Sequence, residues 1–450
     1  MNYNPFYPLK PNSSPAPSGP LDPEEVYCQT RPADWLKMPD VANAPGNLYA
    51  LVLIPQGTTV CFPLLISGAA VRIEYGYTDS NGTFICTSVA SQAATGNFTG
   101  LIDSSDFSHL TSDGHVQCMV RISYQEGQPS IYFQRPAGDN SLTWVSPVRE
   151  ISCNVCSIFL GGYTTALKLL KYFSGYGFPP AYFMFKGISS LIALRHLDTD
   201  QFLDALNFFD GCSSLVAIPH MNTSHIYDFN YMFKDCISLE RVPDLDTTNA
   251  WSLEGLFEGC ISLKELPDMD TSGIQDFRSL IKNCIAIKSF TGFDTSRGTD
   301  FDEMFSGCIS LREVEVNTSY ASSMKDMFKS CHALEYVPAL HTERVEDVDL
   351  FNDSSITALT DLPVSGNTRT LSFENMHALC RVNLSVNGWE GCDVSFEGTF
   401  LSREAYVEFF QSLPVITGEY TITLGIVQGG ANVLTAEDRA IATDKGWILS

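Results

Sequence analysis

A cysteine recurs every 24 residues through the middle of this chain, and this period constrains the fold more than any other feature. The members are Cys212, Cys236, Cys260, Cys284 and Cys308, each 24 residues after the last, and Cys331, which follows after 23. A unit of this length cannot bury its own apolar side, but stacked units cover one another because equivalent positions lie over each other. The period therefore predicts a solenoid with one interior column of cysteines.

The same short pattern surrounds each cysteine. One copy reads Met232-Phe233, Cys236, Leu239, Val242-Pro243 and Asp246-Thr-Thr. The Leu-x-x-Val segment predicts a short parallel strand, and the Met-Phe segment predicts a helical turn or a second short strand on the opposite side. The Asp or Asn of the third segment predicts a turn in which its side chain accepts a local backbone N–H. We expect roughly nine such coils between residues 175 and 385.

The repeat also bears on possible metal sites and disulfides. One cysteine per coil indicates free, buried thiols, because Cys behaves as a small apolar residue and no paired His accompanies it. The acidic column Asp246, Asp270 and Asp294 is explained by turn capping, with calcium binding as the alternative. Cys153 and Cys156 form an isolated Cys-x-x-Cys pair without the second pair that a zinc site needs. We therefore expect no metal and no cofactor.

The repeat resembles a known family. Met-Phe-x-x-Cys-x-Ser-Leu-x-x-Val-Pro-x-Leu-Asp-Thr-Ser is similar to the BspA-like leucine-rich repeat of bacterial surface adhesins and of phage tail or appendage proteins, particularly those of marine phages. The similarity extends over close to half the chain. Two flanking segments, Arg31-Pro-Ala-Asp-Trp35-Leu-x-Met-Pro39 and Leu434 to Trp447, are similar to the opening and closing motifs of such phage proteins. The resemblance implies a bacteriophage virion protein.

The segment before the repeat predicts a β-domain. Residues 28–160 contain alternating apolar runs at 49–54, 71–77, 116–124 and 130–133, separated by Gly, Asn, Ser and Asp, as in an all-β sandwich. In the phage proteins that the chain resembles, this domain is similar to a PKD domain and carries an Asp-Trp-Gly-Asp-Gly-like strand. The comparable strand here reads Ile73-Glu74-Tyr75-Gly76-Tyr77 and lacks the second Asp-Gly.

The two ends of the chain differ from the middle. Residues 1–27 contain seven prolines, which disfavour helix and favour extended chain. Tyr3, Phe6 and Tyr7 could anchor this segment to another virion protein, and a disordered tail is the alternative. Residues 386–450 predict a capping unit with a helix over 402–413, a strand over 420–426 and a second helix opened by Thr435-x-x-Asp438. The expected fold is thus mainly β with short helices: a PKD-like β-sandwich, a leucine-rich-repeat solenoid over 161–385 and an α/β cap.

Composition and the lack of known motifs exclude several classes of function. The formal net charge is −25, which repels nucleic acids and anionic lipids. The N-terminus lacks the pattern of a secretory signal, and no uncharged apolar run is long enough to predict a membrane helix. The eight histidines are scattered, and neither a Gly-x-Ser-x-Gly motif nor a phosphate-binding loop is present. We expect a protein that is not an enzyme, does not bind nucleic acid and does not insert into membranes.

The two x positions of Leu-x-x-Val predict a recognition surface, because both point away from the core. They form two columns of mainly charged residues: Glu240, Lys264, Lys288, Arg312 and Glu335 in the first, and Arg241, Glu265, Ser289, Glu313 and Tyr336 in the second. Opposite charges in neighbouring coils, as in Glu240 with Lys264, could equally be a solvated ladder that only keeps the surface soluble. Loops at the coil edges, such as residues 318–323, compete for the binding role.

The expected function combines these points. The chain is predicted to be a structural or appendage protein on the surface of a phage particle, present as a homo-oligomer or in multiple copies, that binds a host surface protein or glycan through its solenoid. A bacterial cell-surface adhesin is the alternative. A glycan depolymerase is a third, and it would need paired acidic residues in a cleft.

Overall fold

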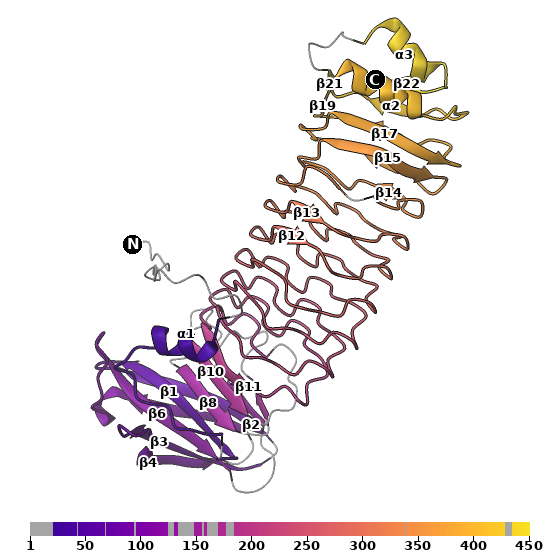
Figure 1. The fold of residues 1–450 in the computed structure, drawn as a ribbon. Coiled ribbons are helices and arrows are strands. Elements are labelled where there is room, and N and C mark those ends of the chain that lie inside the picture. The colour runs from indigo at the N-terminus through magenta and orange to yellow at the C-terminus, as the bar shows by residue number, and fades with distance from the viewer. Residues whose placement is uncertain are drawn as a thin grey trace.

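The chain forms a long β-solenoid that joins a β-domain at the N-terminal end to two helices at the C-terminal end (Figure 1). In this computed structural model, the structure describes residues 21–427 and 434–450, except residues 43, 68, 94–95, 125–129, 134–147, 155–156, 160–169, 177–183 and 338. The molecule is mainly β with few short helices, and the solenoid has about 10 turns. Both features agree with the sequence-based prediction.

A seven-stranded sheet, in the order β11-β10-β8-β1-β6-β3-β4, connects the N-terminal domain to the solenoid. It is antiparallel from β4 to β8 and parallel from β8 to β11. The strands are β1 (Asn47–Pro55), β3 (Val71–Thr78), β4 (Phe84–Ala93), β6 (His115–Ser123), β8 (Val148–Asn154), β10 (Tyr172–Tyr176) and β11 (Ala193–Leu197). Predicted strands at 49–54, 71–77 and 116–124 coincide with β1, β3 and β6.

A second sheet in the order β5-β2-β7-β9 packs its apolar side chains into the same buried cluster as the first. Phe62, Leu64 and Ile131 lie there together with Leu48 and Val120. The strands of this sheet are β2 (Thr59–Ser67), β5 (Gly96–Asp103), β7 (Ser130–Phe133) and β9 (Ser157–Phe159), and a 3-10 turn, η1 (Ser104–Asp106), follows β5. The strand predicted over 130–133 is β7.

The parallel column of the solenoid begins at β8, earlier than the predicted start at residue 161. Val148-x-x-Ile151, Leu170-x-x-Phe173 and Leu191-x-x-Leu194 repeat the Leu-x-x-Val spacing, and all six of these residues are buried. The first two of these coils lack the cysteine that marks the others, so the sequence pattern did not reveal them, whereas the third lies within the predicted range of 175–385. The β-domain therefore closes the N-terminal end of the solenoid by sharing a sheet with it.

The predicted extended conformation of residues 1–27 is wrong for its last part, because α1 (Pro23–Thr30) is a helix. Pro23 occupies the first turn, where its missing N–H breaks no helical hydrogen bond. Asp22 caps the helix by accepting from the Glu24 N–H at 2.9 Å. Together with Trp35, α1 packs on the outer face of the seven-stranded sheet, in one apolar cluster with Tyr172 and Ala217.

A buried carboxylate fixes α1 to the first coil. Glu150 on β8 is 2% exposed and accepts from the Tyr27 hydroxyl at 2.7 Å and from Arg31 Nε at 2.8 Å. Farther along the helix, Glu24 pairs with Arg195 on β11 at 2.6 Å. The helix therefore lies across the first three strands of the parallel column, from β8 to β11.

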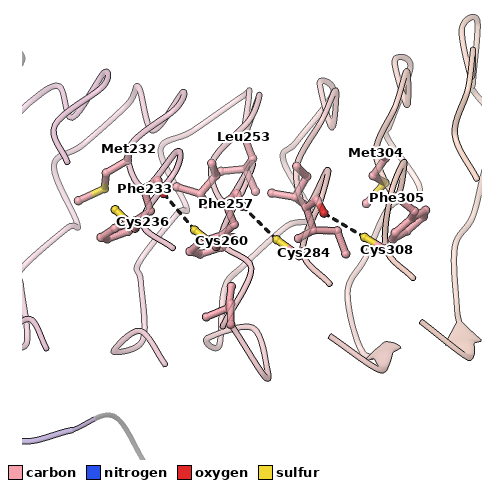
Figure 2. Close-up of a cluster of buried hydrophobic side chains, with 14 of the residues drawn as sticks. Met232, Phe233, Cys236, Leu253, Phe257, Cys260, Cys284, Met304, Phe305 and Cys308 are labelled. Atoms are coloured by element: carbon pink, nitrogen blue, oxygen red, sulfur yellow. Dashed lines mark hydrogen bonds between the residues drawn. The ribbon is translucent and has the colours of Figure 1, made fainter. Parts of the chain in front are cut away.

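The predicted cysteine column is confirmed: all six thiols are free and fully buried. Figure 2 shows Cys236, Cys260, Cys284 and Cys308 of this column. Each Sγ donates to a backbone carbonyl of the preceding coil; Cys260 to Phe233 O, for example, spans 3.0 Å. Burial raises the pKa of Cys260, so the thiol stays protonated and able to donate. Beside it, Phe209, Phe233 and Phe257 stack with ring centroids 5.4 and 5.7 Å apart. The thiols and rings thus join neighbouring coils from inside.

A threonine column joins the coils at the turn. The Thr247 hydroxyl donates to Asp270 O at 2.7 Å, and the Asp246 N–H donates to Thr223 Oγ1 at 2.7 Å. The members are 0–3% exposed: Thr199, Thr223, Thr247, Thr271, Thr295, Thr318 and Thr342. Most of these hydroxyls form hydrogen bonds with backbone N–H or C=O groups of the next coil, which have no backbone partner within the turn.

The Met-Phe segment is neither the helical turn nor the second strand that the sequence offered as alternatives. It is a run of tight turns with two left-handed residues per coil, as at Tyr231 (φ 58°) and Asp235 (φ 56°). These conformations interrupt any helix after one turn and direct N–H groups to the next coil. Asp235 N donates to Glu258 O at 2.7 Å, for instance.

Proline decides where the Leu-x-x-Val segment forms a regular strand. In coils with proline after the last apolar residue, as at Pro243 and Pro267, the missing N–H limits the pairing to isolated bonds such as Lys264 N to Glu240 O at 3.1 Å. Two coils without it form β12 (Ser289–Phe290) and β13 (Glu313–Val314), because Glu315 N reaches Phe290 O at 2.8 Å.

Parallel strands continue to the end of the chain, across the predicted boundary at residues 385 and 386. One sheet has the order β14-β16-β18-β20-β22, and pairs form between β15 and β17 and between β19 and β21. Their bounds are β14 (Asp347–Val348), β15 (Ala358–Ser365), β16 (Thr370–Ser372), β17 (Arg381–Asn387), β18 (Val394–Ser395), β19 (Phe400–Leu401), β20 (Thr421–Thr423), β21 (Ile426–Val427) and β22 (Ile448–Leu449).

Two helices lie at this end, both close to their predicted positions. They are α2 (Arg403–Ser412), capped by Ser402, and α3 (Ala436–Thr443), with a capping box between Thr435 and Asp438. Phe409 of α2 packs edge-on against Phe373 and Phe396 of the last coils. The predicted strand over 420–426 is divided into β20 and β21.

We expect Cys260→Ser to lower the free energy of unfolding by about 1 kcal/mol or more, because a more strongly hydrated hydroxyl must be buried in an apolar column. Urea unfolding measures the effect. Cys380→Ser is the matched control, since Cys380 is exposed and should tolerate the change. Equal stability of the two variants would contradict the role of the thiol column.

We expect Glu150→Ala to cost about 3 kcal/mol or more, because it leaves the Arg31 cation, whose side chain is 11% exposed, without its buried partner. Glu24→Ala removes an exposed pair in the same helix and should cost about 1 kcal/mol or less. Urea unfolding together with amide exchange over 23–30 distinguishes them. Identical exchange rates in both variants would show that Glu150 does not hold α1.

Candidate functional site

The predicted recognition columns form one continuous surface, which we call the ladder face: Glu240, Arg241, Lys264, Glu265, Lys288, Arg312, Glu313, Glu335 and Tyr336 with the intervening Ser289. The residues on either side of each pair in the sequence are apolar and mostly buried; Leu263 and Leu311, for example, are 0% exposed. The pairs themselves are exposed or half-buried. The structure therefore brings all the predicted residues together on the outside of the coils.

The predicted ion pairs are present at one end of the face. Lys264 Nζ contacts Glu240, and Arg241 contacts Glu265, in each case between neighbouring coils. Because at least one partner in each pair is about half exposed, each is worth about 0–1 kcal/mol. Their main effect is to neutralise this part of the surface.

The other end of the face carries unpaired charges. Among the residues that the structure describes, neither Lys288 nor Arg312 has a carboxylate oxygen within 4.0 Å of its side-chain nitrogens, although both are exposed. Tyr336 lies in the coil after Arg312, and 69% of its surface is exposed. This part of the face offers two cations and an aromatic ring to a ligand, beside the exposed carboxylates of Glu313 and Glu335.

The ladder face has covered ends. The equivalent positions in the first coils, Tyr172, Ala193 and Ala217, are buried in one cluster with side chains of α1 and of residues 35–41. At the other end α2 contacts the face, because Arg381 of β17 pairs with Glu408 of α2 at 2.6 Å, while the Arg381 side chain stays 57% exposed. Among the described residues, the ladder face is thus open between α1 and α2.

A second flank of the solenoid is acidic. Asp276 and Asp300 lie in one column of parallel bridges, and Arg278 contacts both. Its Nη2 lies 2.8 Å from Asp276 Oδ2 and 3.1 Å from Glu254 Oε2, and its Nε lies 3.4 Å from Asp300 Oδ2. Burial nevertheless raises the pKa of Asp300 to about 6. Sequence reasoning missed this cluster, because the equivalent positions of successive coils, Glu254, Arg278, Asp302 and Lys325, alternate in charge and show no single chemistry.

Turn capping by the acidic column is confirmed. Asp246, Asp270 and Asp294 each accept the N–H of the residue two positions later, at 3.2, 3.0 and 2.9 Å. Hydrogen bonds from Ser272 and Ser296 lower the pKa of Asp270 and Asp294. In the part of the chain that the structure describes, no group of three His, Cys, Asp or Glu side chains is arranged to hold a metal ion.

Several predicted positions lie outside the described residues. They are Tyr3, Phe6 and Tyr7 of the anchor segment, and Cys156 of the Cys-x-x-Cys pair. Its partner Cys153 is buried on β8 and contacts Ser174 O at 3.7 Å. Within the described ranges, no helix is long and apolar enough to cross a membrane.

An exposed apolar row was also missed. Leu203, Tyr227 and Trp251 occupy the same position in three successive coils, with 52, 46 and 58% of their surfaces exposed. The coils are joined here, because Tyr227 N donates to Leu203 O at 3.0 Å. The sequence signal was available, since the three residues are 24 positions apart. The row was not recognised as a possible binding surface, because the next residue at this position, Gln275, is polar and ends the apolar pattern.

Comparison with known families agrees with the repeat. A family described as "Mycoplasma protein of unknown function, DUF285" matches residues 181–290 and, in an overlapping match, residues 251–358. The chain is a β-solenoid repeat protein. Its repeats are similar to this family over residues 181–358, about two fifths of the chain. No curated protein sequence matches the chain.

We expect Asp300→Asn to stabilise the protein at pH 7.5 and to lose this advantage by pH 4. The folded-state pKa of Asp300, about 6, lies above the value of about 3.9 for an unfolded aspartate. The fold favours the protonated carboxyl of Asp300, so this group stabilises the protein below pH 4 and loses that contribution as the pH rises through 6. Asn stays uncharged throughout, so the variant gains its advantage only at the higher pH. Urea unfolding across this range measures the difference.

Asp294→Asn is the matched control for this experiment. Hydrogen bonds from Ser296 lower the pKa of Asp294, so its contribution is present at neutral pH and lost as the pH falls. The two variants should change the pH dependence of stability in opposite directions. The same direction in both would contradict the assignment for Asp300.

Proposed function

We propose that this protein is a surface appendage of a bacteriophage particle and recognises its host through the ladder face. The observation that carries the proposal is the open stretch of this face between α1 and α2. Solenoids present such extended surfaces to partners. The resemblance of the repeats and of the segments at 31–39 and 434–447 to phage appendage proteins supports a virion location.

Further parts of the proposal concern assembly. The N-terminal β-domain is a PKD-like sandwich, and the segment with Tyr3, Phe6 and Tyr7 anchors the chain to another virion protein. Several copies decorate each particle, and the partner on the host is a surface protein or glycan. The proposal assigns binding and no catalytic step, and it includes neither nucleic acid nor membrane insertion.

A bacterial cell-surface adhesin is the second candidate. It is favoured by the description of the matching family, which names Mycoplasma. The ladder face would serve the same purpose in that setting. The two candidates differ in where the protein is found, so one localisation experiment separates them.

Mass spectrometry of purified particles tests the virion location, with peptides of this chain expected in constant ratio to the capsid protein. In particles assembled with Tyr3→Ser, Phe6→Ser and Tyr7→Ser together, this ratio should fall at least about twofold, because the aromatic anchors are lost. Tyr320→Ser, at an exposed tyrosine of the solenoid, is the control and should leave the ratio unchanged. Recovery of the protein only in the bacterial envelope fraction would favour the adhesin.

A further inference from the structure

We propose that Lys288 and Arg312 bind the acidic groups of an anionic polysaccharide laid along the ladder face. The inference rests on the proposed function, because it names the ligand class for the same surface. It begins from two neighbouring cations of the ladder face that, unlike Arg241 and Lys264, have no carboxylate oxygen within 4.0 Å among the described residues.

Four other cations on this side of the solenoid have carboxylate partners. Arg195 pairs with Glu24 of α1 and Arg381 with Glu408 of α2, both at 2.6 Å, while Arg241 and Lys264 pair within the face. In the pairs of Arg195 and Arg381, the carboxylate comes from a helix that packs on this side. Within the described chain, Lys288 and Arg312 lack such a partner, and Figure 1 shows no helix beside the neighbouring strands β12 and β13.

The backbone holds these two cations side by side. Arg312 N donates to Lys288 O at 2.8 Å, directly before the regular strands β12 and β13. Neighbouring strands are about 4.8 Å apart, and like charges opposite each other across strands are destabilising. An anion placed between the two side chains would remove this repulsion.

The charge of the surroundings favours the same ligand. The ladder face contains four cations (Arg241, Lys264, Lys288 and Arg312) and four carboxylates (Glu240, Glu265, Glu313 and Glu335), so its net charge is zero. The whole chain has a net charge of −25. This face therefore repels a negatively charged polymer less than the molecule as a whole does.

The shape of the face favours a polysaccharide over a protein. Protein interfaces depend on apolar or aromatic anchors in desolvated pockets. The ladder face is a row of exposed polar side chains, with Tyr336 as its one aromatic residue. A flexible acidic chain can follow such a row, and the exposed Tyr336 ring can stack on the apolar face of a sugar.

Binding of the purified full-length chain to immobilised alginate and to dextran sulfate tests the inference, with uncharged dextran as the reference polymer. We expect binding that weakens with added salt and that falls about tenfold or more in the Lys288→Glu/Arg312→Glu variant. The matched control is Arg297→Glu/Lys325→Glu, which changes the net charge equally at exposed cations outside the ladder face. It should bind like the unchanged protein.

Three outcomes would overturn the inference: no binding to either acidic polymer, equal binding to dextran, or equal loss in the control variant. Binding to vesicles of anionic lipid but to neither polymer would assign the cations to a membrane surface instead. Adsorption of particles to host cells is measured separately with the same variants. Loss of polymer binding with unchanged adsorption would leave the inference standing and contradict the proposed recognition role.

Discussion

Every coil of this molecule depends on its neighbours, because a single coil has too little chain to cover its own apolar side. The consequence is visible in the interior columns. The thiol of Cys260 donates to the coil before it, the Thr247 hydroxyl donates to the coil after it, and Phe233 stacks on both neighbouring rings. These contacts require the same residue at the same place in each coil, which explains why the repeat is so regular in sequence.

The same dependence would leave the apolar side of the first and last coils exposed. The two ends of the stack are covered in different ways. At the N-terminal end the antiparallel strands of the β-domain pair directly with β8, so the solenoid continues an existing sheet. At the other end α2 packs its Phe409 against the last coils. The helices also cover part of the outer surface, and this covering, rather than the repeat, sets the limits of the open ladder face.

Charge on the outside of the solenoid is distributed unevenly. On the acidic flank, Arg278 contacts three carboxylates from three coils, and Asp300 still has a raised pKa. On the ladder face, cations and carboxylates are equal in number. An approaching anion therefore meets a net negative charge on one flank and no net charge on the other, although both are built on the same repeat.

The sequence by itself determined the features that recur with the period. These include the solenoid, the buried cysteine column, the Asx turns and the outward columns with the Glu240–Lys264 pair, because each follows from local spacing repeated many times. Helix α2 was also predictable, since its cap and apolar spacing are local. The tertiary structure alone decided the features that depend on distant segments. Three examples are the pairing of β1 with β8, the burial of Glu150 beneath Tyr27 and Arg31, and the lack of a carboxylate partner for Lys288 among the described residues. All three depend on which residues lie opposite one another. A one-dimensional pattern does not contain that information, because the contacting residues are more than 100 positions apart or belong to covers whose position is set by packing.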